Sequence, residues 1–191
     1  MTSFTIFGTG NMGSAIAGVV SAGGSSVQHI GRETDATVSG EVVVLAVPYP
    51  ALDGILAAYA DQFVGKVVVD ITNPLDFETF DALVTPADGS AAAELAAALP
   101  QSRVVKAFNT TFAATLATKT VGGSAPTTVL VAGDDAEAKA LLIDAVIAGG
   151  VKAIDAGALK RARELEAIGF LQLTLAVSEK IGWTGGFALL P

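Results

Sequence analysis

The chain has 191 residues, of which 51% are hydrophobic and 16% charged, and its formal net charge is −8. This composition supports a folded chain and argues against disorder, and we expect residues 1–191 to form a single domain. Because there is no cysteine, disulfides and thiolate chemistry are excluded. With His29 as its single histidine, the chain is also expected to hold no metal.

The same composition bears on partners and location. The acidic balance disfavours nucleic acid, because neutralising phosphates requires clustered Lys and Arg. No apolar run reaches the roughly 18 to 20 residues of a membrane span. The N-terminus has no basic segment followed by a cleavage site, so we expect no signal peptide and a cytoplasmic protein.

Along the chain, short apolar runs alternate with segments of helical spacing. The expected strands are residues 3–8, 26–31, 41–47, 66–74, 103–110, 127–133 and 151–157. The expected helices are residues 11–24, 52–63, 90–100, 135–150 and 159–182, with Ser90 as a candidate N-cap. Only about nine residues, 32–40, separate the second and third strands, too few for a full crossover helix, so a loop or single turn is expected there.

Strands that alternate with helices predict an α/β fold of the Rossmann type, with a doubly wound, mostly parallel sheet and a long C-terminal helix. In such a sheet, ligands bind along the edge formed by the carboxyl ends of the strands. The last helix has an apolar face formed by Leu159, Ala162, Leu165, Ile168, Gly169, Leu173, Ala176 and Val177. Because further apolar residues lie off this face, we expect residues 158–191 to be covered by the tail or by a second subunit, and a homodimer is favoured.

The stretch FTIFGTGNMGSAIAG, residues 4–18, contains the spacing G-x-G-x-x-G between an expected strand and an expected helix. In that context the motif predicts a dinucleotide site. Gly8 permits the tight turn, Gly10 lets a pyrophosphate approach the backbone, and Gly13 lets the helix pack close to the strand. The N–H groups of residues 11–13 and the helix dipole supply the anion site.

The residues at the end of the second strand indicate which dinucleotide the protein binds. An NAD site usually has an acidic residue there, whereas this chain has Gly31 and Arg32, and arginine pairs with a 2′-phosphate. This favours NADP(H). The alternative is a solvated loop arginine, since the acidic Glu33 and Asp35 follow directly.

The other strand ends, AVPYP, ITNP, AFNT and DAGAL, are poor in groups that donate or accept protons. Hydride transfer between two stacked rings needs mainly position and orientation, and these strand ends fit that chemistry best. Lys106 and Tyr49 remain candidate proton donors. A structural role is favoured for His29, and Asp70 requires a partner within its apolar run.

Several stretches together resemble the NADP oxidoreductases that depend on coenzyme F420, a deazaflavin. They are GTGNMGSAIA, AVPYPAL, VVVDITNPLD, SAAAELAAALP with RVVKAFNTTF, and LKRARELE, and they cover nearly the whole chain. The resemblance implies a Rossmann fold that binds NADP(H) and exchanges hydride with F420 or another flat acceptor. The basic helix that follows the second strand in better-known members is missing here.

The resemblance also implies a set of contact residues. Thr9, Gly10, Asn11 and Met12 would contact the pyrophosphate at the turn that Gly8 and Gly13 shape, and Gly31 and Arg32 would contact the 2′-phosphate. Around the nicotinamide it places Ala46, Val47, Pro48, Asn73, Pro74, Ala107 and Asn109. Candidate aromatic residues for an acceptor pocket are Phe108, Phe112, Trp183 and Phe187, which are equally suited to the core.

Two other functions stay open. A catalytically silent NADP(H) sensor would explain the sparse catalytic groups and the apolar last helix. The opening GTGNMGSAIA also resembles pyrroline-5-carboxylate reductase, an imine reductase, but that family has a large C-terminal helical domain where this chain has one helix and a tail.

Overall fold

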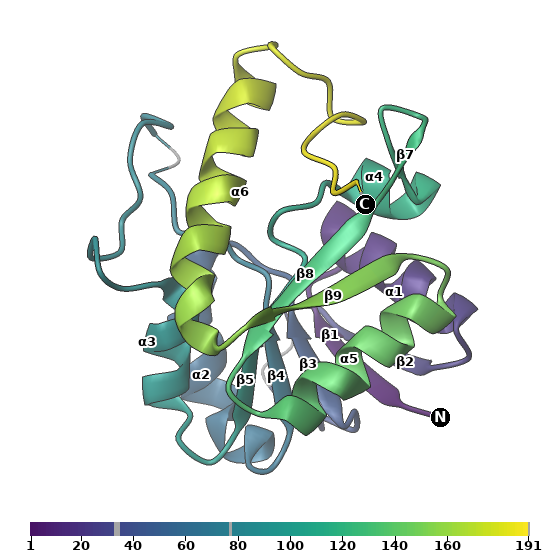
Figure 1. Cartoon of the computed structure of the whole chain (residues 1–191). Helices are drawn as coiled ribbons and strands as arrows, with labels where there is room; N and C mark the ends of the chain where they lie inside the picture. The colour runs from purple at the N-terminus through teal and green to yellow at the C-terminus, as the bar shows by residue number, and fades with distance from the viewer. Residues whose placement is uncertain (33–34, 77, 191) are drawn as a thin grey trace.

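The computed structural model describes residues 1–32, 35–76 and 78–190. A seven-stranded sheet runs through the molecule in the order β2-β1-β3-β4-β5-β8-β9 (Figure 1). Its strands are β1 (Ser3–Phe7), β2 (Ser26–Ile30), β3 (Val42–Leu45), β4 (Val67–Asp70), β5 (Arg103–Lys106), β8 (Thr128–Gly133) and β9 (Lys152–Gly157). All neighbouring strands are parallel except β5 and β8, so the expected mostly parallel α/β sheet is confirmed.

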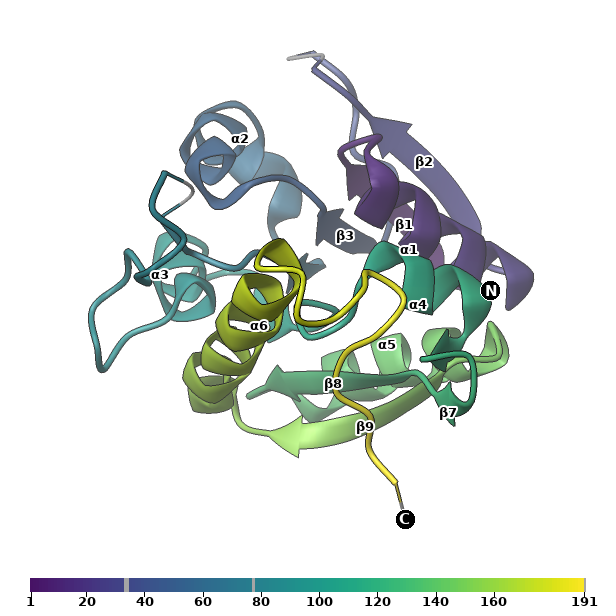
Figure 2. The same cartoon turned by 90° about the horizontal axis from the view of Figure 1, so that it is seen from above.

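Helices cover both faces of the sheet (Figure 2). They are α1 (Asn11–Ala22), α2 (Leu52–Tyr59), α3 (Ala91–Ala98), α4 (Ala113–Thr118), α5 (Ala136–Ala148) and α6 (Ala162–Val177), with 3₁₀ turns η1 (Tyr49–Ala51), η2 (Ala60–Phe63) and η3 (Leu159–Arg161). One apolar core joins the sheet to α1, α4 and α5, and a second joins it to α2, α3 and the start of α6. Strands β3 and β4 are buried along their whole length, which explains their uninterrupted valine and leucine runs.

Several boundaries differ from the expectation. The strands expected over 66–74 and 103–110 leave the sheet after Asp70 and Lys106, and the residues that follow form loops at its carboxyl edge. The sequence pattern did not reveal α4 or the small hairpin of β6 (Thr120–Val121) and β7 (Ala125–Pro126). The expected N-cap is confirmed, since Ser90 Oγ accepts a hydrogen bond from Ala93 N at 3.1 Å.

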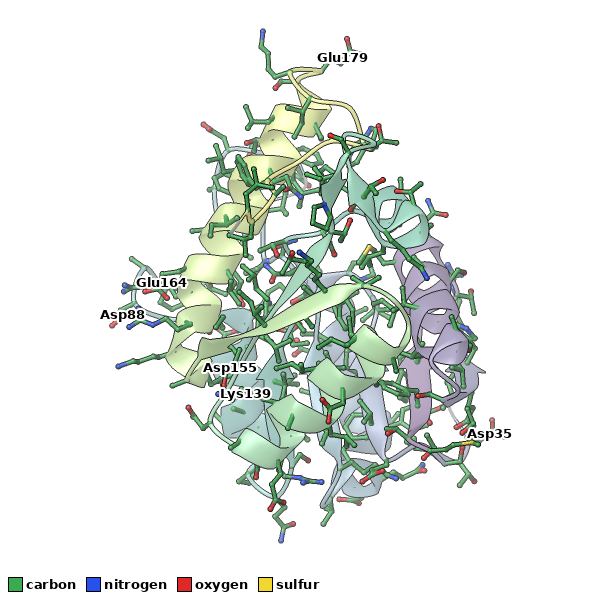
Figure 3. All side chains as sticks on the ribbon, turned by 45° about the vertical axis from the view of Figure 1, so that its right-hand side comes forward. Asp35, Asp88, Lys139, Asp155, Glu164 and Glu179 are labelled. Atoms are coloured by element: carbon green, nitrogen blue, oxygen red, sulfur yellow. The ribbon has the colours of Figure 1, made fainter. Side chains whose placement is uncertain are left out.

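The last helix is shorter than expected, and its buried face is different. It ends at Val177, and the chain reverses at Glu179, which has a φ of 59° and lies at the far end of α6 (Figure 3). Ile168 and Val177 were expected on the buried face but are 37% and 45% exposed. Buried Glu166 and Gln172 take part in the inward face instead, because each has polar partners there.

The short connection after β2 is a loop over its described part, residues 35–40, as expected. Two glutamines hold it. Gln28 Oε1 accepts a hydrogen bond from Ser39 N at 3.1 Å, and Gln62 Oε1 accepts one from Val38 N at 2.8 Å. Glu33 and Thr34, which belong to the same connection, lie outside the described residues.

At the far edge of the sheet, β9 is tied to α5 by an ion pair. Lys139 Nζ lies 2.7 Å from Asp155 Oδ2 (Figure 3). The hydrogen bond from Lys139 lowers the pKa of Asp155 below its ordinary value. The pair fixes the end of β9, from which the chain enters α6.

Candidate functional site

The three motif glycines lie at the turn from β1 into α1. Gly8 has a φ of +101°, and a Cβ there would lie 2.2 Å from the carbonyl oxygen of Ala46. At Gly13 a Cβ would lie 2.4 Å from the carbonyl oxygen of Gly8. Gly10 is different, because a Cβ there would meet no described atom within 4 Å. Gly8 and Gly13 are therefore needed for packing, whereas Gly10 borders open space.

Helix α1 starts with its first turn uncapped. Its N-cap is Gly10, no side chain caps it, and no acidic residue lies in its first turn. The first N–H groups of a helix have no acceptor inside the helix, and the helix dipole is positive at this end. Thr9 and Asn11 are exposed beside it. This end of α1 is suited to bind an anion.

A cleft of about 350 Å³ opens between this turn and the carboxyl edge of the sheet. It brings together residues from α1, from the loops after β4 and β5, from α4, from α6 and from the tail. Its lining residues are Asn11, Met12, Ile71, Asn73, Phe108, Asn109, Thr111, Phe112, Ala113, Ala114, Leu173 and Trp183. The volume is in the range of small-molecule sites, and the lining is mainly apolar with a few amides.

Two asparagines form part of the cleft surface and hold α6 against it. Asn109 Nδ2 donates to Asn73 Oδ1 at 2.9 Å and to the carbonyl oxygen of Leu165 at 2.8 Å. Asn73 Nδ2 donates to the carbonyl oxygen of Asn109 at 3.0 Å. Asn109 Oδ1 is buried and receives no hydrogen bond from the described residues. Buried polar atoms normally have a partner, so this oxygen is a candidate acceptor for a ligand.

The turn after β5 is strained. Phe108 is fully buried and has a φ of 64°, a left-handed conformation that aromatic residues rarely adopt. Asn109 N donates to the carbonyl oxygen of Ala107 at 2.9 Å, and Thr111 N to that of Phe108 at 3.0 Å. Such strain persists where the surroundings impose it and is concentrated at functional sites. Here it accompanies the turn that brings Asn109 to the cleft.

Below the cleft lies a buried charged network centred on Lys106. Lys106 Nζ donates to Asp70 Oδ2 and to Glu166 Oε1, both at 2.8 Å, and to the carbonyl oxygen of Thr72 at 2.6 Å. The three charged side chains are at most 1% exposed. Asp70 thus has the partner that its apolar run required. With all three protons of Lys106 engaged, the prediction that it could donate a proton in the cleft is wrong.

Glu166 extends this network to a helix end. Its Oε2 accepts a hydrogen bond from Ala91 N at 3.1 Å, at the start of α3. Burial raises the pKa of Glu166, and the attraction of Lys106 opposes that rise. The network therefore joins β4, β5, α3 and α6 behind the cleft. Burying such charges is costly unless they have partners. Here one ammonium serves both carboxylates, and the N–H groups of Ala91 and Ala92 complete the partners of Glu166.

Tyr49, the second candidate proton donor, lies elsewhere. Its hydroxyl donates to Glu94 Oε2 of α3, in a separate recess beside α2. This hydrogen bond, together with burial, raises the pKa of Tyr49 to about 12. Tyr49 does not line the cleft, so this prediction is also wrong.

The remaining predicted contact residues differ in how exposed they are. Gly31, Arg32 and Pro48 are exposed, Ala46 and Val47 are half-buried, and Pro74 and Ala107 are buried. Arg32 forms no ion pair within the described part of the chain. His29 Nδ1 lies 3.3 Å from the carbonyl oxygen of Gly8, a position that supports the glycine turn. These residues lie at the edge of the motif turn and the strand ends rather than in the cleft itself.

Three of the four candidate aromatic residues line the cleft: Phe108, Phe112 and Trp183. The fourth, Phe187, lines a different groove with Leu130 of β8 and Ile168 and Leu171 of α6. Thr111, Ala113 and Ala114 were missed because α4 is short and carries no strong pattern. Their position just after the AFNT strand end was the available signal.

The described residues form neither a metal cluster nor a membrane-spanning helix. They contain no group of three or more His, Cys, Asp or Glu side chains that could hold a metal ion. No described helix combines the length and the apolar character needed to cross a membrane.

Comparison with known proteins gives consistent matches. Residues 26–74 match the model of the family described as NADP oxidoreductase, coenzyme F420-dependent. The F420-dependent NADP reductase of Methanocaldococcus jannaschii is 36% identical over 167 residues, which cover 85% of this chain and 74% of that protein. A crystal structure assigned as an F420-dependent NADP reductase from Arthrobacter sp. FB24 has a TM-score of 0.84 and 25% identity, with both chains covered completely.

The fold is shared more widely. Pyrroline carboxylate reductase from Plasmodium falciparum, solved with NADP bound, has a TM-score of 0.59 and 12% identity over 93% of this chain and 67% of that one. At this identity the likeness concerns the fold alone.

Proposed function

Because the chain belongs to the family of NADP oxidoreductases that depend on coenzyme F420, we propose that it is an NADP(H)-dependent enzyme that transfers hydride between nicotinamide and a flat acceptor. F420 is the candidate acceptor. The observation that carries the proposal is the cleft, which joins the uncapped start of α1 to the strand-end amides Asn73 and Asn109.

For the cofactor, we propose one continuous path from the motif turn into the cleft. The pyrophosphate would lie over the open space at Gly10, against the first N–H groups of α1. A ligand N–H group, such as that of the nicotinamide carboxamide, would satisfy Asn109 Oδ1. The proposed contacts are Thr9, Gly10, Asn11 and Met12 for the pyrophosphate, in a turn that Gly8 and Gly13 shape, Gly31 and Arg32 for the 2′-phosphate, and Ala46, Val47, Pro48, Asn73, Pro74, Ala107 and Asn109 around the nicotinamide.

The composition of the cleft favours hydride transfer between rings. None of its described lining residues is titratable. A reaction that must protonate an alkoxide or amine in place needs a positioned acid, which this lining does not supply. Ring-to-ring hydride transfer needs the two rings held in contact, and an apolar cleft with fixed amides supplies that. The same observation weighs against imine reduction.

The choice of NADP(H) over NAD(H) is tested at Arg32. Arg32→Ala is expected to weaken NADPH binding by about 1.5–3 kcal/mol, roughly 10- to 100-fold, and to leave NADH binding unchanged. Isothermal titration calorimetry with both cofactors measures this. Arg161→Ala, which removes an exposed arginine from η3, is the matched control and should affect neither cofactor. Equal affinity of the wild-type protein for NADPH and NADH would show that the Arg32 assignment is wrong.

The sensor alternative predicts cofactor binding without turnover. Anaerobic steady-state assays with NADPH and F420, a flavin or a quinone separate the two functions. Oxidation of NADPH at an enzymatic rate with any of these acceptors eliminates the silent sensor.

We further propose a cytoplasmic homodimer without nucleic-acid or membrane partners. The support is an apolar groove that Ile168 and Leu171 of α6 line together with Leu189 of the tail, and these three side chains are 37%, 52% and 47% exposed. Exposed apolar surface of this kind is typical of an interface. Sedimentation velocity should show a dimer at micromolar concentration that Leu171→Glu dissociates, and a wild-type monomer would contradict the proposal.

A further inference from the structure

The C-terminal tail, residues 178–190, contributes one aromatic residue to the cleft. After the reversal at Glu179 it turns back and runs between α6 and α4, as both views show (Figures 1 and 2). Its Trp183 lines the same cleft as the motif residues Asn11 and Met12 of α1. The tail thus adds an aromatic surface to a site otherwise built from the sheet edge and helices.

Trp183 is exposed to an unusual degree for its size. It is the chain's single tryptophan, and 53% of its surface is exposed. Its ring contacts that of Phe112 edge to face, with centroids 5.0 Å apart and planes at 61°. Phe112, by contrast, is only 7% exposed. An edge-on neighbour orients the indole, and Trp183 keeps half of its surface exposed while it lines the cleft.

Two contacts hold the tail in this position. Gln172 of α6 is 2% exposed, and its Oε1 accepts a hydrogen bond from Phe187 N at 2.9 Å while its Nε2 donates to the carbonyl oxygen of Thr110 at 3.2 Å. In addition, Gly122 N donates to the carbonyl oxygen of Thr184 at 2.8 Å. Both anchors follow Trp183 in the chain. One joins the tail through Gln172 to the loop after β5, and the other joins it to the hairpin of β6 and β7.

We propose that Trp183 is the stacking surface for a flat, fused-ring hydride acceptor, and that Gln172 positions it. This inference rests on the proposed function and specifies its acceptor side. A flat aromatic ligand gains affinity by stacking on an indole, and this stacking does not depend on specific hydrogen bonds between the two. An acceptor that lies between Trp183 and the strand-end amides would contact a nicotinamide bound in the same cleft. Hydride transfer requires this contact between the two rings.

The test separates the acceptor from the cofactor. Calorimetric titration of F420 into the NADP⁺-saturated protein gives acceptor affinity, and titration of NADP⁺ alone gives cofactor affinity. Trp183→Ala is expected to weaken F420 binding roughly tenfold, in line with stacking on a large aromatic ring. Trp183→Phe should restore most of that loss, and NADP⁺ affinity should change less than about twofold in both variants.

Phe187→Ala is the matched control, because it removes another half-exposed aromatic side chain from the same tail but outside the cleft. It should leave F420 affinity unchanged. Gln172→Leu removes the hydrogen bonds that hold the tail. Because Trp183 is the single tryptophan, its fluorescence emission reports the position of the tail, and we expect this emission to shift to longer wavelength. We also expect this variant to bind F420 more weakly.

The outcomes are distinct. A Trp183→Ala variant that binds F420 as tightly as the wild type, or that loses NADP⁺ in equal measure, overturns the inference and leaves the proposed cofactor intact. Wild-type protein that binds NADP⁺ but not F420 overturns it as well. Wild-type protein that binds no NADP⁺ overturns the proposed function itself.

Discussion

At the scale of single residues, the three motif glycines have different physical tasks. Gly8 and Gly13 are required by the fold itself, because a Cβ at either would overlap a backbone oxygen. Gly10 is not, since it has an ordinary φ of −74° and faces open space. In the proposed function that space belongs to the pyrophosphate, so the folding role and the binding role of the motif fall on separate residues.

This separation can be tested with two alanine variants. Gly10→Ala should change the free energy of unfolding by less than about 0.5 kcal/mol, yet weaken NADPH binding at least about tenfold, because its methyl group occupies the phosphate space. Gly13→Ala should destabilise the protein by roughly 1–3 kcal/mol, because the helix must move away from the strand. Urea denaturation and calorimetry measure the two quantities. If Gly10→Ala binds NADPH normally, the pyrophosphate does not lie over this turn.

At the scale of elements, α6 organises the site. Along one side of the helix, Glu166 binds Lys106, Gly169 meets the asparagine pair, and Leu173 lines the cleft. These three positions are spaced so that they lie on one face of the helix. That face therefore contacts first the charged network, then the two amides and then the cleft. Gln172 lies beside them and anchors the tail.

The close approach of α6 depends on Gly169. A Cβ there would lie 2.3 Å from Asn73 Oδ1 and 2.9 Å from Asn109 Nδ2. Gly169→Ala should therefore lower the free energy of unfolding by roughly 1–3 kcal/mol and weaken NADP(H) binding, because the amides are displaced. Urea denaturation and calorimetry check both effects.

Gly18→Ala in α1 is the matched control for this glycine-to-alanine change. Gly18 is exposed within a helix, and a Cβ there would meet nothing within 4 Å. It should stabilise the protein by about 0.5–1 kcal/mol, which is the gain in helix propensity. Equal effects of the two substitutions would mean that α6 does not depend on close contact with the asparagines.

At the scale of the whole molecule, the fold was largely predictable because its signals are local. Buried parallel strands such as 41–47 are continuous apolar runs, and the G-x-G-x-x-G turn is a contiguous motif. The pairing of Lys106 with Glu166 was not predictable, because these residues are 60 positions apart and meet only after α6 crosses the strand ends. The same long-range contact explains why the buried face of α6 includes a charged residue.

The site was predicted in part for the same reason. Asn11, Met12, Asn73 and Asn109 follow from the motif and the strand ends, and all four line the cleft. The contribution of the tail depends on the reversal at Glu179 and on the anchoring by Gln172, and no periodicity encodes either one. Trp183 could be named as a candidate from its residue type, but its place in the cleft beside residues of α1 required the folded chain.

In the proposed function, the cleft holds NADPH and a flat acceptor in direct contact. The most direct measurement uses NADPH carrying deuterium at C4 of the nicotinamide, prepared in each of its two stereoisomers, with F420 as the acceptor under anaerobic conditions. Mass spectrometry of the reduced F420 should show deuterium delivered from one stereoisomer and not from the other, because a fixed cleft presents one face of the nicotinamide. Reduced F420 without deuterium from either stereoisomer, or no reduction at all, would contradict the account.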